Sequence, residues 1–278
     1  WRELSDHILP RRGRFFTSDV NNGAPKRSTI IDSTASMASR TLASGMMTGV
    51  TSPARDWFRL TTDNPGLNAS TSVKNYLDEV ATKMRATFLR SNLYNVLPTL
   101  YGDLGTFGTG CIFMEEDVKD SVNFLSFPVG SYRIANDMKG NVNIFFREFQ
   151  MTVRQIIEKF GKTNPLDPTF IDWINISETV KSLWQCGNTE SQVDIKHMIL
   201  PNDDYMPKKM ESKFKKYKSV YYENGASTVH STSQDKLLSE KGYDYFPVMA
   251  VRWELAGEDV YGTNSPGMMA LGDTKQLQ

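Results

Sequence analysis

The sequence predicts an α+β protein, and three observations support this class. Apolar residues recur at three- and four-residue spacing in several segments before Gly105, which is typical of amphipathic helices. Short segments rich in β-branched and aromatic residues, separated by turn residues, follow from Gly105 onward. The chain has 278 residues, of which 39% are hydrophobic and 11% aromatic, enough for one large or two modest cores. We therefore expect helices first and a strand-rich region after them.

The first 31 residues are expected to form a basic arm that is extended or loosely helical. They carry Arg11, Arg12, Arg14, Lys26 and Arg27, together with turn residues around Asn22 and Pro25. The chain begins with Trp1 rather than Met, and its last residues, from Pro266 to Gln278, read as the opening of a helix without a stop signal. We therefore expect a piece of a longer polypeptide, truncated at both ends.

Three helices are expected before Gly105. The first, Asp32–Thr51, has Asp32 or Ser33 as its N-cap and is crowded with small residues. Such a helix is weak in isolation, so packing within the protein or against another subunit must stabilise it. The second, Ser72–Arg90, is amphipathic, and the third, Asn92–Leu104, is expected to kink at Pro98. A short strand is expected between the first two, at Asp56–Leu60.

Strands dominate the prediction after Gly105, and two turns are well marked. Asp137–Gly140 and Asn224–Gly225 have the composition of hairpin turns. The predicted strands are Cys111–Glu115, Val122–Phe127, Ser131–Ala135, Asn141–Phe149, Gln192–Leu200, Tyr217–Tyr222, Ala226–Thr232 and Phe246–Leu255.

Two helices are expected within the strand-rich region. Thr152 is the N-cap of the first, Val153–Phe160, which should end at Gly161 in a left-handed conformation. The second is Pro168–Gln185.

Charge and cysteine content exclude several classes of protein. Lys plus Arg number 32, and Asp plus Glu also number 32, so the net charge is zero, which argues against tight binding of duplex DNA by this chain alone. The longest stretch without a charged residue, 41–54, is shorter than the roughly 18 to 20 residues of a membrane-spanning helix. Cys111 and Cys186 are too few for a disulfide framework and too far apart in sequence for a typical metal site.

The motifs of nucleotide binding are incomplete. Gly161-Lys162-Thr163 has the end of a phosphate-binding loop, but Ile156 stands where its first glycine should be. The spacing of Gly102, Gly105, Gly108 and Gly110 does not match a dinucleotide site, so these glycines are expected to form a flexible turn into a strand. We expect no cofactor.

Catalytic candidates are equally sparse. His7, His197 and His230 are scattered and lack a nearby nucleophile motif, which favours surface or core histidines. Glu115, Glu116 and Asp117 could bind a divalent cation through their oxygens, although a solvated turn is the simpler interpretation. This trio motivates one alternative function, a metal-dependent enzyme that processes nucleic acid.

A cluster of lysines provides the candidate contact site. Clustered cations release counterions when they meet phosphate, so the cluster fits an electrostatic contact to DNA or to an acidic partner; a solvated loop or sheet edge fits equally well. Glu211 interrupts the cluster, and aromatic residues are interleaved with it. The lysines are Lys208, Lys209, Lys213, Lys215, Lys216 and Lys218.

Several ordered blocks of sequence resemble the head-to-tail connecting (portal) proteins of short-tailed bacteriophages. They span most of the chain, and the segment 164–245 is included by continuity. The blocks are Asp32–Ser36, Leu42–Leu60, Phe107–Phe113, Phe127–Asp137, Phe146–Gln155 and Tyr261–Gln278.

The resemblance implies a structural, non-enzymatic subunit of a ring, usually of twelve copies, at one vertex of the capsid of a virion. DNA would pass through the ring during genome packaging and ejection. The implied partners are the terminase large subunit, the major capsid and scaffolding proteins, tail adaptor proteins and double-stranded DNA held without sequence specificity. No membrane is involved, and the subunit would occupy the host cytoplasm during assembly.

By the same resemblance, the chain divides into four parts. Residues 1–31 form the arm, and residues 32–163 form a wing of helices and sheet. Residues 164–255 form a strand-rich region that includes the clip, for which Gln192–Arg252 is the candidate. Residues 256–278 begin a stem-like helix.

Overall fold

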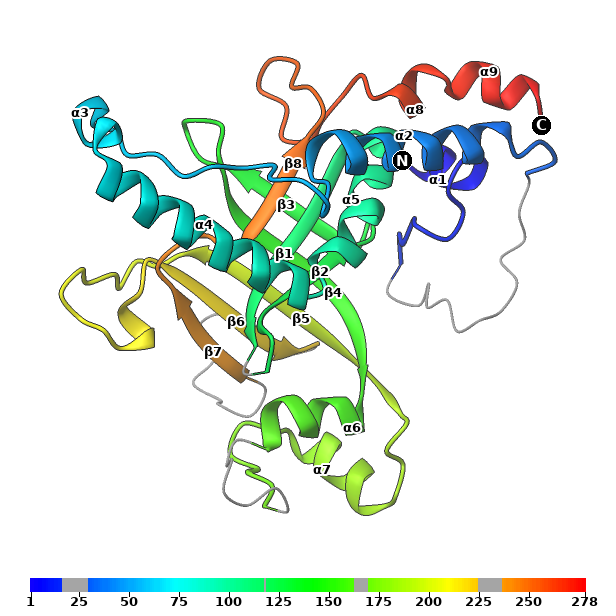
Figure 1. Cartoon of the computed structure of the whole chain (residues 1–278). Coiled ribbons are helices and arrows are strands. Elements are labelled where there is room, and N and C mark those ends of the chain that lie inside the picture. Colours follow the sequence, from blue (N-terminus) through cyan, green and yellow to red (C-terminus); the bar gives the residue numbers. More distant parts are fainter. Residues whose placement is uncertain (17–29, 118, 163–169, 225–236) are drawn as a thin grey trace. The chain divides into compact units, whose positions relative to one another are not determined.

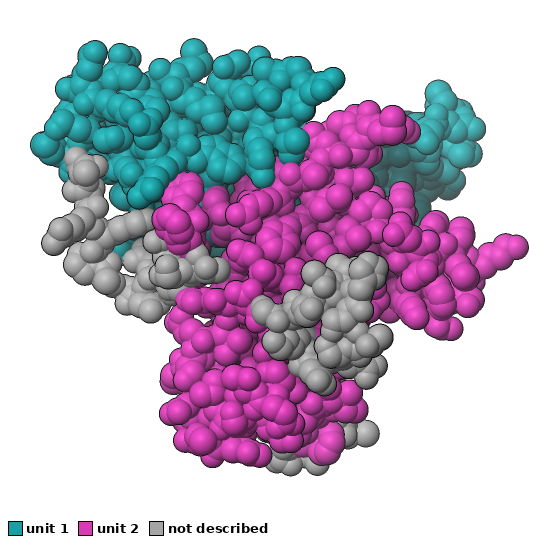
Figure 2. Space-filling model, turned by 180° about the vertical axis from the view of Figure 1, so that it is seen from behind, with its two compact units in different colours: residues 1–13, 25–129, 247–278 teal, residues 14–24, 130–246 magenta. Residues whose placement is uncertain are grey.

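The computed structural model describes residues 1–16, 30–117, 119–162, 170–224 and 237–278 (Figure 1). The chain folds into two compact units, coloured separately in Figure 2. Unit 1 contains residues 1–13, 25–129 and 247–278, and unit 2 contains residues 14–24 and 130–246. Both units combine helices with an antiparallel sheet, which confirms the α+β class. No helix in the described ranges has the length and apolar character needed to cross a membrane.

The long helices of unit 1 confirm the three predicted helices. They are α2 (Thr34–Val50), α4 (Thr71–Arg90) and α5 (Leu93–Phe107), which continues through Pro98. Asp32 Oδ1 accepts a hydrogen bond from Thr34 N at 2.7 Å, and Ser33 is the N-cap, as the sequence predicted for this helix start.

The sheet of unit 1 has three strands in the order β2-β1-β8. These are β1 (Thr109–Asp117), β2 (Ser121–Phe127) and β8 (Val248–Arg252), and all three were predicted within a few residues of their bounds. Helix α5 lies against this sheet, where its leucines pack with Ile112 and Phe124. Ala43 of α2 joins the same hydrophobic cluster.

The start of the chain is helical, one of the two forms predicted for the basic arm, but it is packed rather than free; residues 17–29 of the predicted arm lie outside the described residues. Residues Arg2–His7 form helix α1, and Leu4 and Ile8, one helical turn apart, are both buried against Phe107. Trp1 Nε1 also donates to Phe107 O at 3.0 Å. The first residues are therefore part of the core of unit 1, because two apolar side chains at helical spacing give this short helix a face to bury.

The predicted strand Asp56–Leu60 is absent; this described segment is irregular. It lies along α4, where Arg85 forms an ion pair with Asp56 and the Phe58 ring lies 6.1 Å from that of Phe88. Aromatic packing and a salt bridge therefore position this segment without a partner strand. The short helix α3 (Pro65–Ala69) follows it.

The four glycines expected to form a flexible turn are instead packed in regular structure. Gly102 and Gly105 lie inside α5, Gly108 ends that helix with a φ of 75°, and Gly110 lies in β1. An added Cβ at Gly108 would approach backbone atoms of Gly262, and one at Gly110 would lie 2.7 Å from a Leu100 methyl carbon. Most of these glycines therefore permit close contact between elements.

The sheet of unit 2 has five antiparallel strands in sequence order, with a turn that matches the prediction. Asp137 Oδ1 accepts hydrogen bonds from Lys139 N and Asn141 N, and Gly140 has a φ of 78°. The predicted strand 226–232 lies outside the described residues, and β6 pairs with β7. The strands are β3 (Tyr132–Asn136), β4 (Val142–Thr152), β5 (Gln192–Pro201), β6 (Tyr217–Glu223) and β7 (Leu237–Tyr243).

The helix after β4 begins as predicted but ends differently. Thr152 and Gln155 form a capping box at the start of α6 (Val153–Ile156). The helix then continues as a π-helical turn, η1 (Ile157–Gly161), and Gly161 does not have the predicted left-handed conformation. An ideal Cβ at Gly161 would lie 3.0 Å from Ile176, so the glycine serves packing rather than a phosphate-binding loop.

The second predicted helix of unit 2 begins later than expected, at Glu178 rather than Pro168, and forms α7 (Glu178–Gln185). Ser177 is its N-cap and accepts from Val180 N at 3.3 Å, while its hydroxyl donates to the buried Glu223 carboxylate at 2.7 Å. This tertiary contact fixes the helix start. The core of unit 2 is built from α6, η1, α7 and the sheet.

The C-terminal helix is divided into two. Helices α8 (Pro266–Met269) and α9 (Leu271–Gln276) are separated by Ala270. Ser265 caps α8 and donates its hydroxyl hydrogen bond to Thr106 O at 3.0 Å, which joins this segment to α5. The predicted opening helix is therefore present as two short helices.

Candidate functional site

The predicted lysine cluster maps to one projecting loop and to the strand that follows it. Residues 202–216, here called the lysine loop, connect β5 to β6 and extend beyond the ends of these strands (yellow in Figure 1). Lys218 lies within β6 itself. The loop carries five of the six predicted lysines.

Hydrogen bonds hold the lysine loop in a defined shape. Asn202 donates from its backbone to Lys216 O at 3.0 Å, and its Nδ2 donates to Lys213 O and Lys215 O, each at 2.8 Å. Further along, Met206 N donates to Phe214 O at 3.0 Å. One asparagine therefore closes the base of the loop with three hydrogen bonds.

A second anchor joins the lysine loop to the neighbouring strand. Ser212 lies in the short 3-10 helix η2 (Ser212–Phe214), and its hydroxyl accepts from Gly242 N of β7 at 2.6 Å. A side chain at Gly242 would collide with Ser212 O, so the glycine permits this approach. The loop is thus attached to the sheet at its base and at one side.

The six lysines have different environments. Lys215 forms an ion pair with Asp244 at 2.6 Å, and Lys218 with Glu240 at 2.9 Å. Lys209 Nζ lies 4.0 Å from the centroid of the Phe214 ring, and Lys216 Nζ lies 5.6 Å from that of Tyr217, both cation–π contacts. Lys208 and Lys213 are exposed and have no ion pair within the part of the chain that the structure describes. These two side chains are the cations most available to a partner.

The acidic trio does not converge on one point. The side chains of successive strand residues alternate between faces, so Glu116 points away from the face that Glu115 and Asp117 share. The backbone N–H groups of Asp120 and Lys119 hydrogen-bond the Asp117 carboxylate and lower its pKa. Among residues with described positions, no three His, Cys, Asp or Glu side chains are grouped to hold a metal ion. Asp117 instead stabilises the turn after β1.

The buried His197 is satisfied within the core of unit 2. Its Nδ1 accepts from Arg147 Nε at 3.2 Å, and its Nε2 lies 2.9 Å from Ser219 Oγ. Because a guanidinium can only donate, Nδ1 carries no proton and Nε2 donates to Ser219. This is the opposite of the arrangement in which a histidine accepts a proton from a serine nucleophile. Of the other histidines, His230 lies outside the described residues.

Burial is the main cause of a lowered pKa at His197. The side chain is fully buried, and the charged form would also face the positive charges of Arg147 and Lys159. The imidazole stacks on the Tyr221 ring with centroids 3.8 Å apart. His197 therefore occupies the core, one of the two environments predicted for the histidines, and the geometry favours a structural role.

The comparison with known proteins decides the family. All of residues 1–278 match the model of the family described as bacteriophage head to tail connecting protein. The chain belongs to this family. The resemblance identified from the sequence blocks is thereby confirmed.

Two curated relatives of this chain carry more specific names. The chain is 47% identical over 278 residues to the portal protein of Salmonella phage epsilon15. It is 43% identical over 278 residues to the probable portal protein of Bordetella phage BPP-1. In each comparison the alignment covers 100% of this chain and 47% of the relative, so the chain spans about half the length of the curated relatives it matches.

Helix α2 exposes a surface of small side chains. Ala43 faces the core, whereas Ala38, Thr41, Gly45 and Gly49 are exposed or nearly so. A Cβ atom added at Gly45 or Gly49 would have no atom of the described residues within 4 Å, apart from the neighbouring backbone of α2 itself. Another backbone could therefore approach α2 closely along this side.

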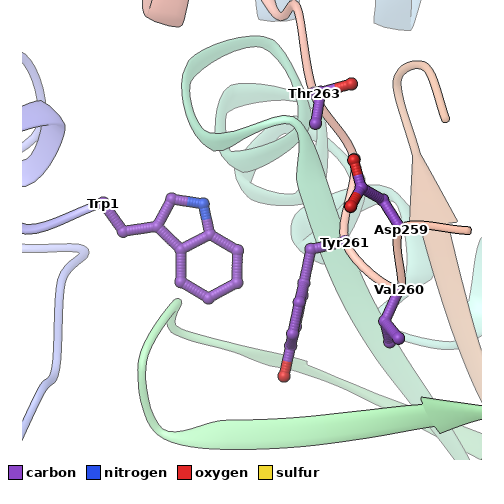
Figure 3. A pocket seen from close by; sticks show the side chains of 6 residues that line it. Trp1, Asp259, Val260, Tyr261 and Thr263 are labelled. Atoms are coloured by element: carbon purple, nitrogen blue, oxygen red, sulfur yellow. The ribbon is translucent and has the colours of Figure 1, made fainter. Parts of the chain in front are cut away.

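A shallow pocket of about 310 Å³ lies beside Trp1 in unit 1 (Figure 3). Its wall includes Tyr261, whose ring meets the Trp1 ring edge to face at 4.8 Å, and Asp259. The lining combines aromatic surface with one carboxylate and lacks a paired base and nucleophile. No sequence pattern indicates this pocket, because residues 1 and 261 come together only in the fold.

Proposed function

We propose that this chain is part of a portal ring subunit at one vertex of a bacteriophage capsid. About twelve copies would close a channel through which double-stranded DNA enters during packaging and leaves during ejection. The ring would dock the terminase large subunit and later the tail adaptor proteins, and it would contact the major capsid and scaffolding proteins. The subunit would reside in the virion, after assembly in the host cytoplasm, and would perform no catalysis itself.

The observation that carries this proposal is the match of the family over the whole chain, joined by one relative named portal protein and one named probable portal protein. In this proposal the domain assignment keeps the wing 32–163, a strand-rich region 164–255 with the clip, and the start of a stem at 256–278. Of the predicted arm 1–31, helix α1 instead packs in the core of unit 1.

The charge of the chain supports a role in passing DNA rather than holding it. A channel that neutralised many phosphates would bind DNA tightly and oppose its movement, because each contact releases counterions. Lys plus Arg and Asp plus Glu are equal in number, at 32 each. Such a balance is compatible with loose, non-specific contact with a moving duplex.

The exposed small residues of α2 support a packed ring. A ring with head-to-tail contacts requires two different complementary surfaces on each subunit. Small side chains allow a neighbouring backbone to come close, and the α2 surface around Gly45 is open in the described chain. We assign this surface to a contact between subunits.

Genetic removal of the protein tests the proposal. A phage with an early stop codon in this gene should produce heads without DNA, and expression of the protein in trans should restore DNA-filled heads. Electron microscopy and quantification of encapsidated DNA would measure both. Normal DNA filling in the absence of the protein would contradict the proposal.

A further inference from the structure

The lysine loop presents apolar side chains next to its free lysines. Met210 is 90% exposed and Met206 is 45% exposed, and both lie within four residues of Lys208. The backbone that carries them is hydrogen-bonded at Asn202 and Ser212. A fixed loop that exposes both methionines and cations is a defined surface.

The charges of the loop make DNA a poor fit. Residues 202–216 contain five lysines but also three acidic residues, Asp203, Asp204 and Glu211, so the excess is two positive charges. One of the five, Lys215, already forms an ion pair with Asp244. Phosphate contacts are made by cations and hydrogen-bond donors, and an exposed thioether supplies neither.

The same features fit a protein surface that is both acidic and apolar. Methionine is flexible and polarisable and adapts to varied apolar partners. Lys208 and Lys213, with no ion pair in the described chain, can meet carboxylates of opposite charge. The loop shape is already fixed, which reduces the entropic cost of binding.

We propose that the lysine loop docks an acidic, amphipathic segment of another protein. Met206 and Met210 would contact the apolar side of that segment, while Lys208 and Lys213 would pair with its carboxylates. This inference deepens the proposed function, on which it rests for the assumption that the subunit has protein partners. It assigns the predicted lysine site to a protein rather than to DNA.

Fluorescence anisotropy of the complete protein with two labelled probes tests the inference. One probe is an amphipathic helical peptide of about 20 residues, long enough to form a helix, with Glu on one face and Leu on the other. The other is a DNA duplex of equal total charge. We expect the peptide to bind more tightly than the duplex at the same ionic strength.

Two double variants separate the contributions of the lysines and of the methionines to peptide binding, and a third double variant is a control. K208E/K213E and M206S/M210S should each weaken peptide binding about tenfold or more, as expected for central contacts. The control, M138S/K139E, changes the same residue types at the exposed turn between β3 and β4 and should bind like the parent protein. Thermal unfolding confirms that each variant is folded.

The possible results distinguish the partners. Duplex binding that is tighter than peptide binding, and is lost in K208E/K213E but kept in M206S/M210S, would assign the loop to DNA and overturn the inference. The absence of peptide binding up to about 1 mM would also overturn it. Native mass spectrometry of the same samples measures ring formation separately. Rings that do not bind the peptide would contradict only the docking inference. Peptide binding by a protein that forms no rings would contradict only the proposed function.

Discussion

The side-chain amide of Asn92 hydrogen-bonds both backbone groups of Phe124. Its Nδ2 donates to Phe124 O at 2.8 Å, and its Oδ1 accepts from Phe124 N at 2.8 Å. Phe124 lies in β2, an edge strand of the sheet in unit 1. The asparagine therefore occupies the place that a further strand would take, and it ties the junction between α4 and α5 to the sheet.

Replacing Asn92 by Ala should destabilise the protein by about 2 kcal/mol, because two partly buried backbone groups lose their partners. Asn95→Ala is the control, since Asn95 is an exposed residue in the first turn of α5, the helix for which Asn92 is the N-cap. Its effect should stay within about 0.5 kcal/mol. Urea unfolding measures both, and equal stabilities of the two variants would contradict the assigned role.

The stability of the protein should fall on acidification because of His197. Its pKa is lowered in the folded state relative to the usual value of 6.5, so the unfolded chain binds a proton first. The stabilisation from neutral His197 is complete above the ordinary histidine pKa of 6.5. It is lost as the pH falls below 6.5, and the free energy of unfolding then decreases by up to about 1.4 kcal/mol per pH unit. Unfolding experiments from about pH 7.5 to about pH 5, a range that spans the ordinary titration of histidine, measure the slope.

The variant His197→Gln separates this effect from other titrations. Glutamine can still accept from Arg147 and donate to Ser219, but it does not titrate. The pH slope of His197→Gln should be smaller than that of the parent protein. Identical slopes for the two proteins would show that His197 does not carry the effect.

Gly108 and Gly262 lie so close together that Gly262 should tolerate no side chain. An added Cβ would collide with the carbonyl oxygen of Gly108, a rigid backbone atom that also accepts from Trp253 N at 2.8 Å. Gly262→Ala should therefore cost about 1–3 kcal/mol, as overpacking does. Gly272→Ala, where an added Cβ has no described atom within 4 Å, is the matched control. Equal stabilities in thermal unfolding would refute the contact.

Gly45→Ala tests the subunit contact assigned to α2. Gly45 in α2 and Gly102 in α5 both lie in helices where a Cβ meets no described atom within 4 Å. Each alanine should stabilise the isolated subunit by about 0.5–1 kcal/mol through helix propensity. Only Gly45→Ala should reduce ring assembly, as measured by native mass spectrometry. Full ring assembly by both variants would exclude this part of α2 from the interface.

Local signals in the sequence predicted the long helices and several strands well. The apolar spacing of α4 and the turn Asp137–Gly140 need only neighbouring residues to specify them. The glycines predicted to form a flexible turn are instead packed against residues that are distant in sequence. Gly105 packs on Leu42, and Gly108 packs on Gly262. The same holds for α7, whose start depends on Glu223. Such contacts have no signature in a local window.

The sequence predicts which lysines form the candidate site, but not their ion pairs or the exposed methionines beside them. The lysines stand together in the sequence, yet Lys215 and Lys218 are paired with acids of the following strand region, Asp244 and Glu240. The exposure of Met206 and Met210 likewise depends on how Asn202 folds the loop. Neither property can be read from the residue types alone.

Electron microscopy of the purified complete gene product, supported by its native mass, is the most direct test of the proposed role. Closed rings of about twelve subunits around a central channel are expected, since the subunit contacts are taken to be head-to-tail and to close on themselves. A protein that remains strictly monomeric at high concentration would contradict the account.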